Sequence, residues 1–390
     1  MMDISFSDRL SNIVAFTDAL SISTGDVTRA REEARALEAD LYSRSGSKDD
    51  YEGLCEGLIM VKSPLPAQVL TESSHEPEED VETLNPDGPS FGDYEQATFH
   101  RDGQMSTIYK AKASKPSAPY SIVALKVTTL SAMEPPHNSA REARLLVEAR
   151  HEYVVPLIES FSQPGGRQVL AFPYLRQDLE NLLRSGVLSQ KQTGMVVKGL
   201  FSALRYVHSL GIIHRDVKPS NILFRSMEGP VFLADFGIAW SPIDPESEAA
   251  NKKIADVGTT SYRPPELLFG YRNYDTSLDM WAAGCVVGEM VKKDHSPLFD
   301  AGPLGSELGL IKSMFETLGT PNDKTWPSAK EFPDWGKMRF QDFPGKSWKD
   351  ILPGVAGEAV DLVSKMVNYE STVRLTAEEV LRHPVVSQER

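Results

Sequence analysis

The order in which β-strand and helix patterns occur along this chain constrains its fold more than any other feature. Residues 121–127 (SIVALKV) and 168–172 (QVLAF) are compact runs typical of β-strands, and residues 139–150 (SAREARLLVEAR) between them are typical of an amphipathic helix. The later patterns are mostly helical, beginning with residues 178–184 and 190–210. A small β-rich part followed by a larger α-rich part predicts an α+β fold with two lobes and a ligand-binding cleft between them.

The composition is that of an ordinary globular protein. Of the 390 residues, 41% are hydrophobic and 25% are charged. The formal net charge of −14 argues against a nucleic-acid-binding surface, because clustered Lys and Arg bind phosphate backbones. Two cysteines, Cys55 and Cys285, are fewer than a secreted disulfide framework usually needs, and neither a signal peptide nor a membrane span of ~20 apolar residues is evident. We therefore expect a soluble intracellular protein with no nucleic-acid or membrane partner, in the nucleus, the cytoplasm or both.

Residues 1–90 differ from the rest and are expected to form an N-terminal extension. Residues 26–42 (DVTRAREEARALEADLY) predict one helix, with Asp26 as its N-cap. Residues 71–89 are acidic, contain several prolines and offer little to bury, so we expect a disordered linker there. The extension is thus predicted to be partly helical and partly disordered.

The strongest functional signal is an ordered polar motif at residues 214–221 (HRDVKPSN). It matches the catalytic-loop pattern H-R-D-x-x-x-x-N of protein kinases at each fixed position. Phosphoryl transfer to a hydroxyl requires a carboxylate that receives the hydroxyl proton, and Asp216 suits that role. An amide oxygen can help to bind Mg²⁺ without adding charge, and Asn221 suits this one.

A second motif, DFG, follows at residues 235–237, directly after the apolar run 231–234 (VFLA). A carboxylate at Asp235 would bind the metal ion that bridges the ATP phosphates. Either tripeptide alone is weak evidence, because HRD also suits a surface helix cap and DFG occurs by chance. The two motifs in this order and at this distance make coincidence an inadequate explanation.

Upstream, residues 123–126 (VALK) resemble the V-A-I-K strand whose lysine contacts the α- and β-phosphates. Glu142 follows on the amphipathic helix, where it can pair with Lys126. Isolated Lys and Glu residues are usually solvated surface charges. Here the strand is apolar and the motifs come in the correct order, which favours an ion pair between the two.

These motifs resemble those of the eukaryotic protein kinases, particularly the cyclin-dependent kinase group. The resemblance runs from about Tyr94 to Pro384 and implies a bilobal protein kinase fold, with an N-lobe over 94–173 and a C-lobe over 174–384. It implies ATP and Mg²⁺ as the ligands, and a protein as the substrate. The sequence Lys218-Pro219 is similar to serine/threonine kinases rather than tyrosine kinases. Further matches to the group are residues 262–266 (YRPPE), 278–281 (LDMW), 318–321 (LGTP) and Arg374, which is placed to pair with Glu266.

The resemblance also implies the nucleotide site. Lys126, held by Glu142, would contact the α- and β-phosphates, and Asp235 with Asn221 would hold Mg²⁺. Asp216 would orient the substrate hydroxyl, while Lys218 would steady the transferring γ-phosphoryl group. The residues expected around the adenine and the ribose are Ile108, Ala124, Leu223, the hinge residues Phe172, Pro173, Tyr174 and Leu175, and Asp178.

The glycine-rich loop departs from the family pattern. Its three glycine positions hold Arg101, Gly103 and Ser106. Two substitutions should weaken the backbone cradle for the phosphates, although Arg101 could add positive charge there. Gln104 and Met105 occupy the positions that group members use for inhibitory phosphorylation, so we expect no inhibition by that route.

The activation segment departs as well. Ile254 occupies the position of the usual activating threonine. Of the three arginines that bind its phosphate in the group, Arg141 and Arg215 remain and the third position holds Trp240. We expect a kinase that needs no activation-loop phosphorylation, with Asp256 as a candidate source of the missing negative charge.

The cyclin-binding helix of the group is also altered. Residues 136–142 (PHNSARE) are similar to P-S-T-A-I-R-E, but Ala140 at the isoleucine position removes an apolar anchor worth roughly 2–4 kcal/mol. This pattern resembles fungal single-subunit kinases that phosphorylate the activation loop of cyclin-dependent kinases, so we expect cyclin-dependent kinases as partners and doubt cyclin binding. A conventional cyclin-dependent kinase and a pseudokinase scaffold are the alternatives; only the altered glycine-rich loop supports the latter.

The preferred sequence of the substrate is open. Gly258 can adopt a positive φ that directs its carbonyl toward Arg263, an arrangement compatible with proline after the target residue. The resemblance to activating kinases favours a folded kinase loop instead.

Overall fold

The chain divides into two compact units, Met1–Glu78 and Glu79–Arg390. The computed structural model describes residues 84–115, 120–186, 188–303 and 305–387, together with residues 9, 12–14, 16–17, 27–45, 48, 51 and 55 in the N-terminal part.

The first unit contains a long helix, α2 (Val27–Arg44), where the sequence predicts a helix over 26–42. Its buried Glu38 accepts hydrogen bonds from Arg9 Nε at 2.6 Å and from the Tyr51 hydroxyl at 2.7 Å. The two donors compensate for the cost of burying a carboxylate. A small apolar core in this unit contains Phe16, Ala34, Leu41, Tyr51 and Cys55.

The disordered linker expected over residues 71–89 is wrong for its last part. Residues 71–83 lie outside the described residues, but Leu84 is buried and residues 84–89 pack beside the first strand of the second unit. Asn85 N–H donates to Thr98 Oγ1 at 2.6 Å, and the N–H of Ala97 donates to the Pro89 carbonyl at 3.0 Å. These backbone hydrogen bonds order a stretch whose composition predicts disorder.

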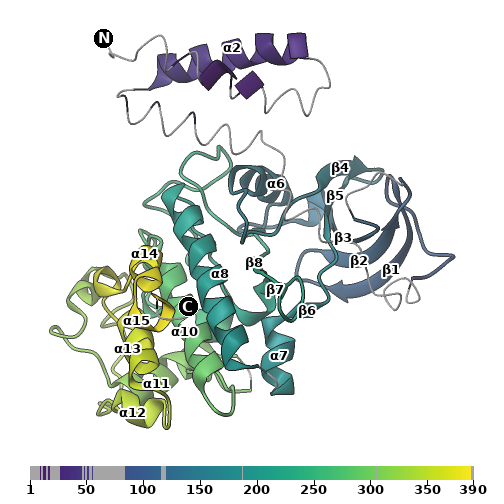
Figure 1. The fold of residues 1–390 in the computed structure, drawn as a ribbon. Coiled ribbons are helices and arrows are strands. Elements are labelled where there is room, and N and C mark those ends of the chain that lie inside the picture. Colours follow the sequence, from purple (N-terminus) through teal and green to yellow (C-terminus); the bar gives the residue numbers. More distant parts are fainter. Residues whose placement is uncertain are drawn as a thin grey trace. The chain divides into compact units, whose positions relative to one another are not determined.

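Five antiparallel strands form the β-rich part of the second unit, in the order β1-β2-β3-β5-β4 (Figure 1). The strands predicted over 121–127 and 168–172 are β3 and β5. Ile108 on β2 pairs with Lys126 on β3, and Ala124 on β3 pairs with Phe172 on β5, so predicted site residues lie on neighbouring strands. The strand bounds are β1 (Tyr94–Asp102), β2 (Thr107–Ala113), β3 (Ile122–Thr129), β4 (Glu159–Gln163) and β5 (Arg167–Pro173).

A single described α-helix of the β-rich part, α6 (Ser139–Glu148), follows β3 after a short 3-10 turn at Leu130–Ala132. Asn138 caps its N-terminus, because its side chain accepts a hydrogen bond from Arg141 N–H at 2.8 Å. The apolar face of the helix buries Leu145 and Leu146 in the main core. Glu142, in the first turn, lies on the buried side one turn before these leucines, while Arg144 and Val147 are exposed.

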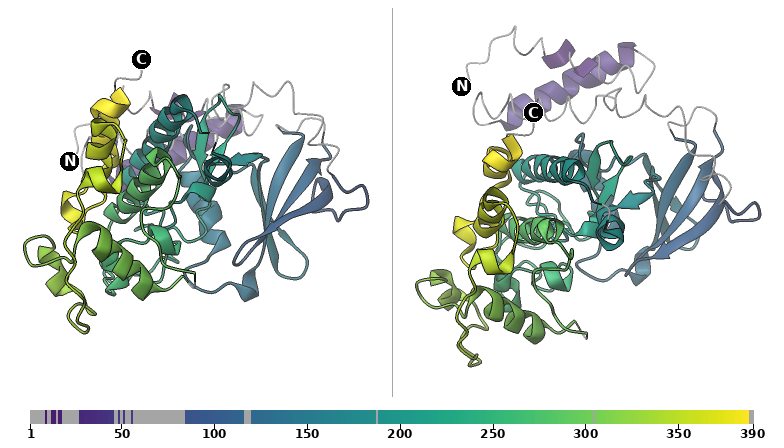
Figure 2. Two further views of the ribbon diagram at one scale, coloured as in Figure 1. Left: turned by 90° about the horizontal axis from the view of Figure 1, so that it is seen from below. Right: turned by 60° about the horizontal axis from the view of Figure 1, so that its bottom comes forward.

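The larger part of the second unit is helical, and the α+β fold with two lobes is confirmed. Figure 2 shows the sheet on one side of the helical part in two further views. Helix α8 packs against α10 and α14. The helices are α7 (Leu179–Ser185), α8 (Gln190–Ser209), α9 (Pro265–Leu268), α10 (Ser277–Val291), α11 (Glu307–Leu318), α12 (Trp348–Ile351), α13 (Gly357–Met366), α14 (Ala377–Leu381) and α15 (Pro384–Ser387), with a small sheet of β6 (Gln177–Asp178), β7 (Ile222–Phe224) and β8 (Val231–Leu233). Among the described helices, none is both long and apolar enough to cross a membrane.

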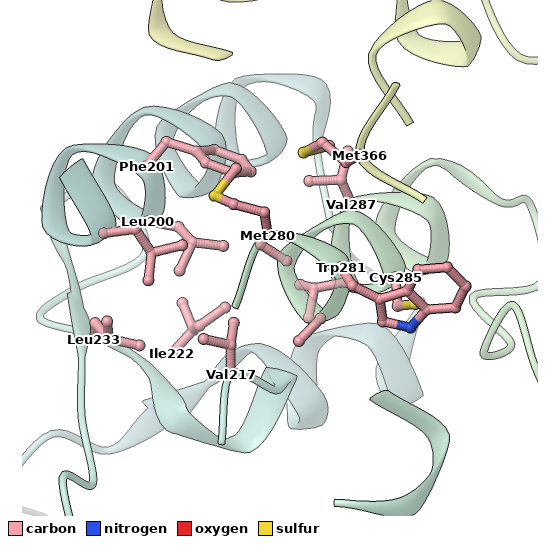
Figure 3. Packing of buried hydrophobic residues seen from close by; sticks show 14 of the residues in the cluster. Leu200, Phe201, Val217, Ile222, Leu233, Met280, Trp281, Cys285, Val287 and Met366 are labelled. Carbon is pink, nitrogen blue, oxygen red and sulfur yellow. The ribbon is translucent and has the colours of Figure 1, made fainter. Parts of the chain in front are cut away.

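Helix α10 runs through the centre of the helical core, and its residues are apolar on nearly all sides. Figure 3 shows Met280 and Trp281 of α10 among side chains from α8, α13 and the short strands. Gly284 permits the close approach of α13, since a Cβ atom at Gly284 would lie 2.8 Å from Met366 Cβ. Because α10 is buried on all faces, it is a rigid support for the segments that bond to it.

The ion pair that the sequence predicts between Arg374 and Glu266 is present. Arg374 Nη1 and Nη2 lie 2.6 and 2.7 Å from the two carboxylate oxygens of Glu266. Both residues are buried, at 5% and 2% exposure. The pair joins the end of the activation segment to the C-terminal part of the core.

Candidate active site

The first group of site residues meets around Lys126 of β3. Lys126 Nζ lies 2.7 Å from each carboxylate oxygen of Glu142 on α6 and 2.7 Å from Oδ1 of Asp235. The predicted Lys126–Glu142 ion pair is therefore present, and the DFG aspartate is joined to it.

Lys126 and Asp235 stabilise each other's charge. Burial alone would lower the pKa of Lys126, but the Asp235 and Glu142 carboxylates raise it above its ordinary value. Burial alone would raise the pKa of Asp235, but the Lys126 ammonium lowers it well below the usual range. At neutral pH, Lys126 is therefore a cation and Asp235 an anion, the states needed to bind phosphate oxygens and a metal ion.

A second group surrounds Asp216. Its Oδ1 accepts a hydrogen bond from the Thr259 hydroxyl at 2.8 Å, and its Oδ2 lies 2.7 Å from Lys218 Nζ and 3.1 Å from Asn221 Nδ2. Lys218 Nζ also donates to Thr259 Oγ1 at 2.9 Å. The carboxylate is thus held at both oxygens, as a group that must meet a substrate hydroxyl in a fixed orientation requires.

The catalytic loop rests on the buried helix α10. The two carboxylate oxygens of Asp279 accept hydrogen bonds from the backbone N–H groups of His214 at 2.8 Å and Arg215 at 2.9 Å. Asp279 is fully buried, and His208 Nε2 lies 2.9 Å from its Oδ2. These bonds hold Arg215 at a φ of 69°, a left-handed conformation that a residue other than glycine rarely adopts. Asp279, within the matched residues 278–281, therefore anchors the loop.

The two motifs are also joined to each other. Ala234 N–H donates to the Asn221 carbonyl at 2.9 Å, and His214 Nε2 lies 3.0 Å from the Ala234 carbonyl. The rings of His214 and Phe236 meet edge to face at 4.7 Å. Asn221 and Asp235, the two predicted metal ligands, are thereby held on adjoining segments.

The residues present fit a magnesium ion. The Asn221 amide nitrogen donates to the Asp216 carbonyl at 2.8 Å and to Asp216 Oδ2 at 3.1 Å, so its Oδ1 is the atom that would bind the metal. Asp235 would supply a charged oxygen. Mg²⁺ typically takes one or two protein oxygens together with substrate phosphates and water. Bound there, it would neutralise charge on the phosphate oxygens during transfer.

The residues expected around the base lie on the strands that flank the two groups. Ile108 is the cross-strand neighbour of Lys126, and Phe172 that of Ala124. From the helical part, Leu223 on β7 pairs with Phe232. The hinge residues Phe172 and Pro173 end β5, and the Tyr174 N–H donates to the Ile122 carbonyl at 3.4 Å.

Asp178, expected near the ribose, is the N-cap of α7. Its Oδ1 accepts from Asn181 N–H at 2.8 Å, and its Oδ2 accepts from the Asn181 amide at 3.0 Å. The contact with a ribose stays a prediction, and a structural role for Asp178 is already evident.

The three glycine-loop positions lie on the hairpin between β1 and β2. Arg101 is in β1, paired with Ile108, while Gly103 and Ser106 form the turn. Gly103 N–H donates to the Ser106 carbonyl at 2.7 Å, so this amide closes the hairpin instead of pointing outward. A hairpin closed in this way offers fewer amides to phosphate, in line with the weakened cradle that the sequence predicts.

One expectation about the activation segment is wrong. Asp256, suggested as the missing negative charge, is an exposed residue that pairs with Arg263. The carboxylate that Arg215 contacts belongs to Glu248, with two distances of 3.2 Å. Arg263 also donates from Nε to the carbonyl of Gly258 at 3.1 Å, and Gly258 has a φ of 80°, as expected.

Sequence reasoning missed Thr259, His100 and Glu248. Thr259 carries a hydroxyl and directly follows Gly258, which is expected near the substrate. This position in the sequence could have identified Thr259 as a site residue. His100 precedes the first expected loop position, and its exposed ring meets Tyr174 of the hinge edge to face at 5.7 Å. Glu248 belongs to an acidic run at 244–248 (DPESE) that is visible in the sequence.

Comparison with known proteins agrees with this geometry. The protein kinase domain family matches residues 101–386. The serine/threonine-protein kinase csk1 of Schizosaccharomyces pombe is 35% identical over 276 residues, which are 69% of this chain and 87% of that protein. Cyclin-dependent kinase 20 of Danio rerio is 35% identical over 73% of this chain and 80% of that protein, and cyclin-dependent kinase 7 of Xenopus laevis is 32% identical over 74% and 80%. This chain therefore belongs to the protein kinase family, as a serine/threonine kinase of the cyclin-dependent kinase group that uses ATP and Mg²⁺.

Proposed function

We propose that this kinase works as a single chain, without cyclin, and phosphorylates the activation loop of cyclin-dependent kinases. The observation that carries the proposal is the ion pair of Lys126 with Glu142, joined to Asp235 within one chain. Protein kinases need this lysine–glutamate pair and the DFG aspartate in place for catalysis. In cyclin-dependent kinases a partner helps to set that arrangement; here contacts inside the chain accompany it.

Two features of α6 support independence from cyclin. Arg144 Nε lies 2.7 Å from Asp244 Oδ2, and the Asn138 amide donates to Glu246 Oε2 at 2.6 Å, so the helix is tied to the activation segment of its own chain. Ala140 offers a methyl group where the group has an isoleucine. An apolar anchor of that size is often worth roughly 2–4 kcal/mol at an interface.

The chemistry follows from the positions of the charged side chains. Asp216 would orient the substrate hydroxyl and accept its proton as the oxygen bonds to the γ-phosphorus. The bond from that phosphorus to the β,γ-bridging oxygen breaks, and the electron pair leaves with ADP. Lys218 would steady the γ-phosphoryl oxygens, while Lys126 would neutralise charge on the α- and β-phosphates. Positioning and charge stabilisation supply most of the catalysis in such a site.

The substrate is proposed from the absence of a hydroxyl at position 254 and from the relatives. A kinase that carries Ile254 cannot be activated at that position, so it can act upstream of kinases that carry threonine there. The similarity to cyclin-dependent kinases 7 and 20 agrees with a place in this group, and their names do not specify a target.

An assay with the purified chain alone tests the proposal. The acceptors are a catalytically inactive cyclin-dependent kinase, the same protein with its activation-loop threonine replaced by alanine, and a generic acceptor protein. We expect incorporation into the first at a rate far above the other two. Equal labelling of the threonine and alanine proteins would refute the proposed substrate. Copurification of a stoichiometric cyclin, with no activity in its absence, would favour a conventional cyclin-dependent kinase.

A further inference from the structure

We propose that Glu248 is a built-in counter-charge that positions the catalytic loop, in place of an activating phosphate. Glu248 belongs to what we term the acidic hook, Asp244, Glu246 and Glu248 of the activation segment. The inference concerns the kinase reaction itself and does not depend on the identity of the protein substrate.

The argument begins with the buried guanidinium of Arg215. The residue is 1% exposed. Its Nη1 and Nη2 each lie 3.2 Å from a carboxylate oxygen of Glu248, its Nε donates to the Ile238 carbonyl at 2.7 Å, and Nη1 also donates to the Tyr274 hydroxyl at 3.0 Å. Glu248 is the carboxylate in this set, and a buried cation that lost it would be left uncompensated.

A second buried arginine increases the need for negative charge. Arg141 is 3% exposed, and its Nε has no hydrogen-bond partner among the described residues. Burial lowers the pKa of Arg141, and the nearby Arg215 lowers it further, while Glu248 opposes both effects. Arg141 Nη1 donates to the Glu246 carbonyl at 3.3 Å, so a second buried cation lies against the same segment as Glu248.

The position of Arg215 directly affects the position of the neighbouring Asp216. Arg215 precedes Asp216, and its backbone is held at a φ of 69° by the hydrogen bond to Asp279. A left-handed conformation is costly for a residue other than glycine, so the surrounding contacts must hold it in place. Asp279 bonds to its backbone, and Glu248 bonds to its side chain together with the Ile238 carbonyl and the Tyr274 hydroxyl.

The rest of the acidic hook holds α6. Arg144 lies 2.7 Å from Asp244 and 2.9 Å from Glu246, and the Asn138 amide lies 2.6 Å from Glu246. This helix carries Glu142, the partner of Lys126. A single five-residue stretch therefore contacts both the catalytic loop and the helix that sets the lysine–glutamate pair.

The sequence changes around the hook are consistent with this role. Trp240, which replaces an arginine of the group, donates from Nε1 to the Glu248 carbonyl at 2.8 Å. Ile254, which replaces the threonine, is half-buried and packs beside the apolar cluster that contains Trp240 and Tyr274. The negative charge has thus moved from position 254 to position 248, and the phosphate-binding third arginine is no longer required.

Substitution of Glu248 tests the inference in the full-length kinase. Glu248→Gln keeps the shape and removes the charge; we expect kcat per ATP-binding site to fall about 10- to 100-fold, with KM for ATP changed less than threefold. Glu248→Asp retains the negative charge, and its kcat should lie between those of wild type and Glu248→Gln. Glu228→Gln, an exposed glutamate elsewhere in the helical part, is the matched control and should match wild type.

Three further measurements test whether Glu248 acts by positioning the catalytic loop, and not by stabilising the fold or together with a phosphate. ATP-analogue binding gives the folded fraction, and a kcat for Glu248→Gln that equals wild type after this correction would overturn the inference. In an Arg215→Gln background, Glu248→Gln should lower kcat little further, because the arginine that Glu248 contacts has been removed. An equal loss of kcat in both backgrounds would also overturn the inference. Phosphatase treatment should leave wild-type activity unchanged, and a loss of activity would show that a phosphate supplies the charge.

Discussion

Lys126 Nζ lies 2.7 Å from Asp235 Oδ1, although 109 positions separate the two residues in the chain. The contact joins the β-rich part of the second unit to the segment that leaves the catalytic loop. It brings the predicted phosphate ligand and the predicted metal ligand to one place. The account of the site depends on this convergence, and the predictions below address its parts.

Asp216→Asn should abolish turnover while nucleotide binding persists. The amide cannot accept the hydroxyl proton, and general-base catalysis contributes about 10²- to 10⁴-fold. Kinetics and titration with a fluorescent ATP analogue measure the two effects separately. Asp323→Asn, at an exposed position, is the control. Normal turnover in Asp216→Asn would contradict the assigned role.

Thr259→Ala should lower kcat about 10-fold or more and leave the stability of the protein nearly unchanged. The Thr259 hydroxyl donates to Asp216 at 2.8 Å and accepts from Lys218 at 2.9 Å, so its removal frees both side chains. Thr259→Ser keeps the hydroxyl and should retain most of the activity. If the serine and alanine variants have the same kcat, the hydroxyl does not position Asp216.

The sequence predicted a β-rich part before a helical part, and it named candidate site residues that the structure brings together. Lys126, Asp216, Asn221 and Asp235 lie in short motifs in which neighbouring letters define each role. Thr259 and Glu248 could not be assigned in this way, because their roles depend on pairing with residues far away in the chain. Asp256 was a poor candidate for the same reason: proximity in sequence to Ile254 does not decide which carboxylate meets Arg215.

Local composition also misled at one segment. Residues 84–89 are polar and contain prolines, yet backbone hydrogen bonds to β1 order them. The sequence also did not reveal that Asp178 is the N-cap of α7. An aspartate suits both a ribose-binding position and a helix N-cap, so the residue type does not distinguish the two roles.

Arg374→Leu should lower the free energy of unfolding by about 3–5 kcal/mol, since it leaves the buried Glu266 carboxylate without its partner. Urea denaturation followed by fluorescence measures this loss. Arg382→Ala is the control: its pair with Glu378 is exposed and should contribute less than about 1 kcal/mol. Similar effects of the two substitutions would be inconsistent with a buried pair at Glu266.

The contribution of Glu248 to stability should depend on pH. Burial alone would raise the pKa of Glu248, but its hydrogen bonds with Arg215 lower it below the unfolded value of about 4.3. A group with a lowered pKa stabilises the fold above its unfolded pKa, and this stabilisation is lost as the pH falls through the folded pKa. The difference in unfolding free energy between wild type and Glu248→Gln should therefore be largest near pH 7 and shrink below about pH 4. Denaturation curves at several pH values test this; a difference that stays constant with pH would count against the ion pair.

The most direct test of the central claim is the activity of the purified, phosphatase-treated chain with no partner protein present. A site assembled by contacts within one chain predicts ATP-dependent phosphorylation of a protein acceptor at a rate that neither added cyclin nor prior phosphorylation increases. Activity that appears only after cyclin is added, or only after the activation segment is phosphorylated, would contradict it.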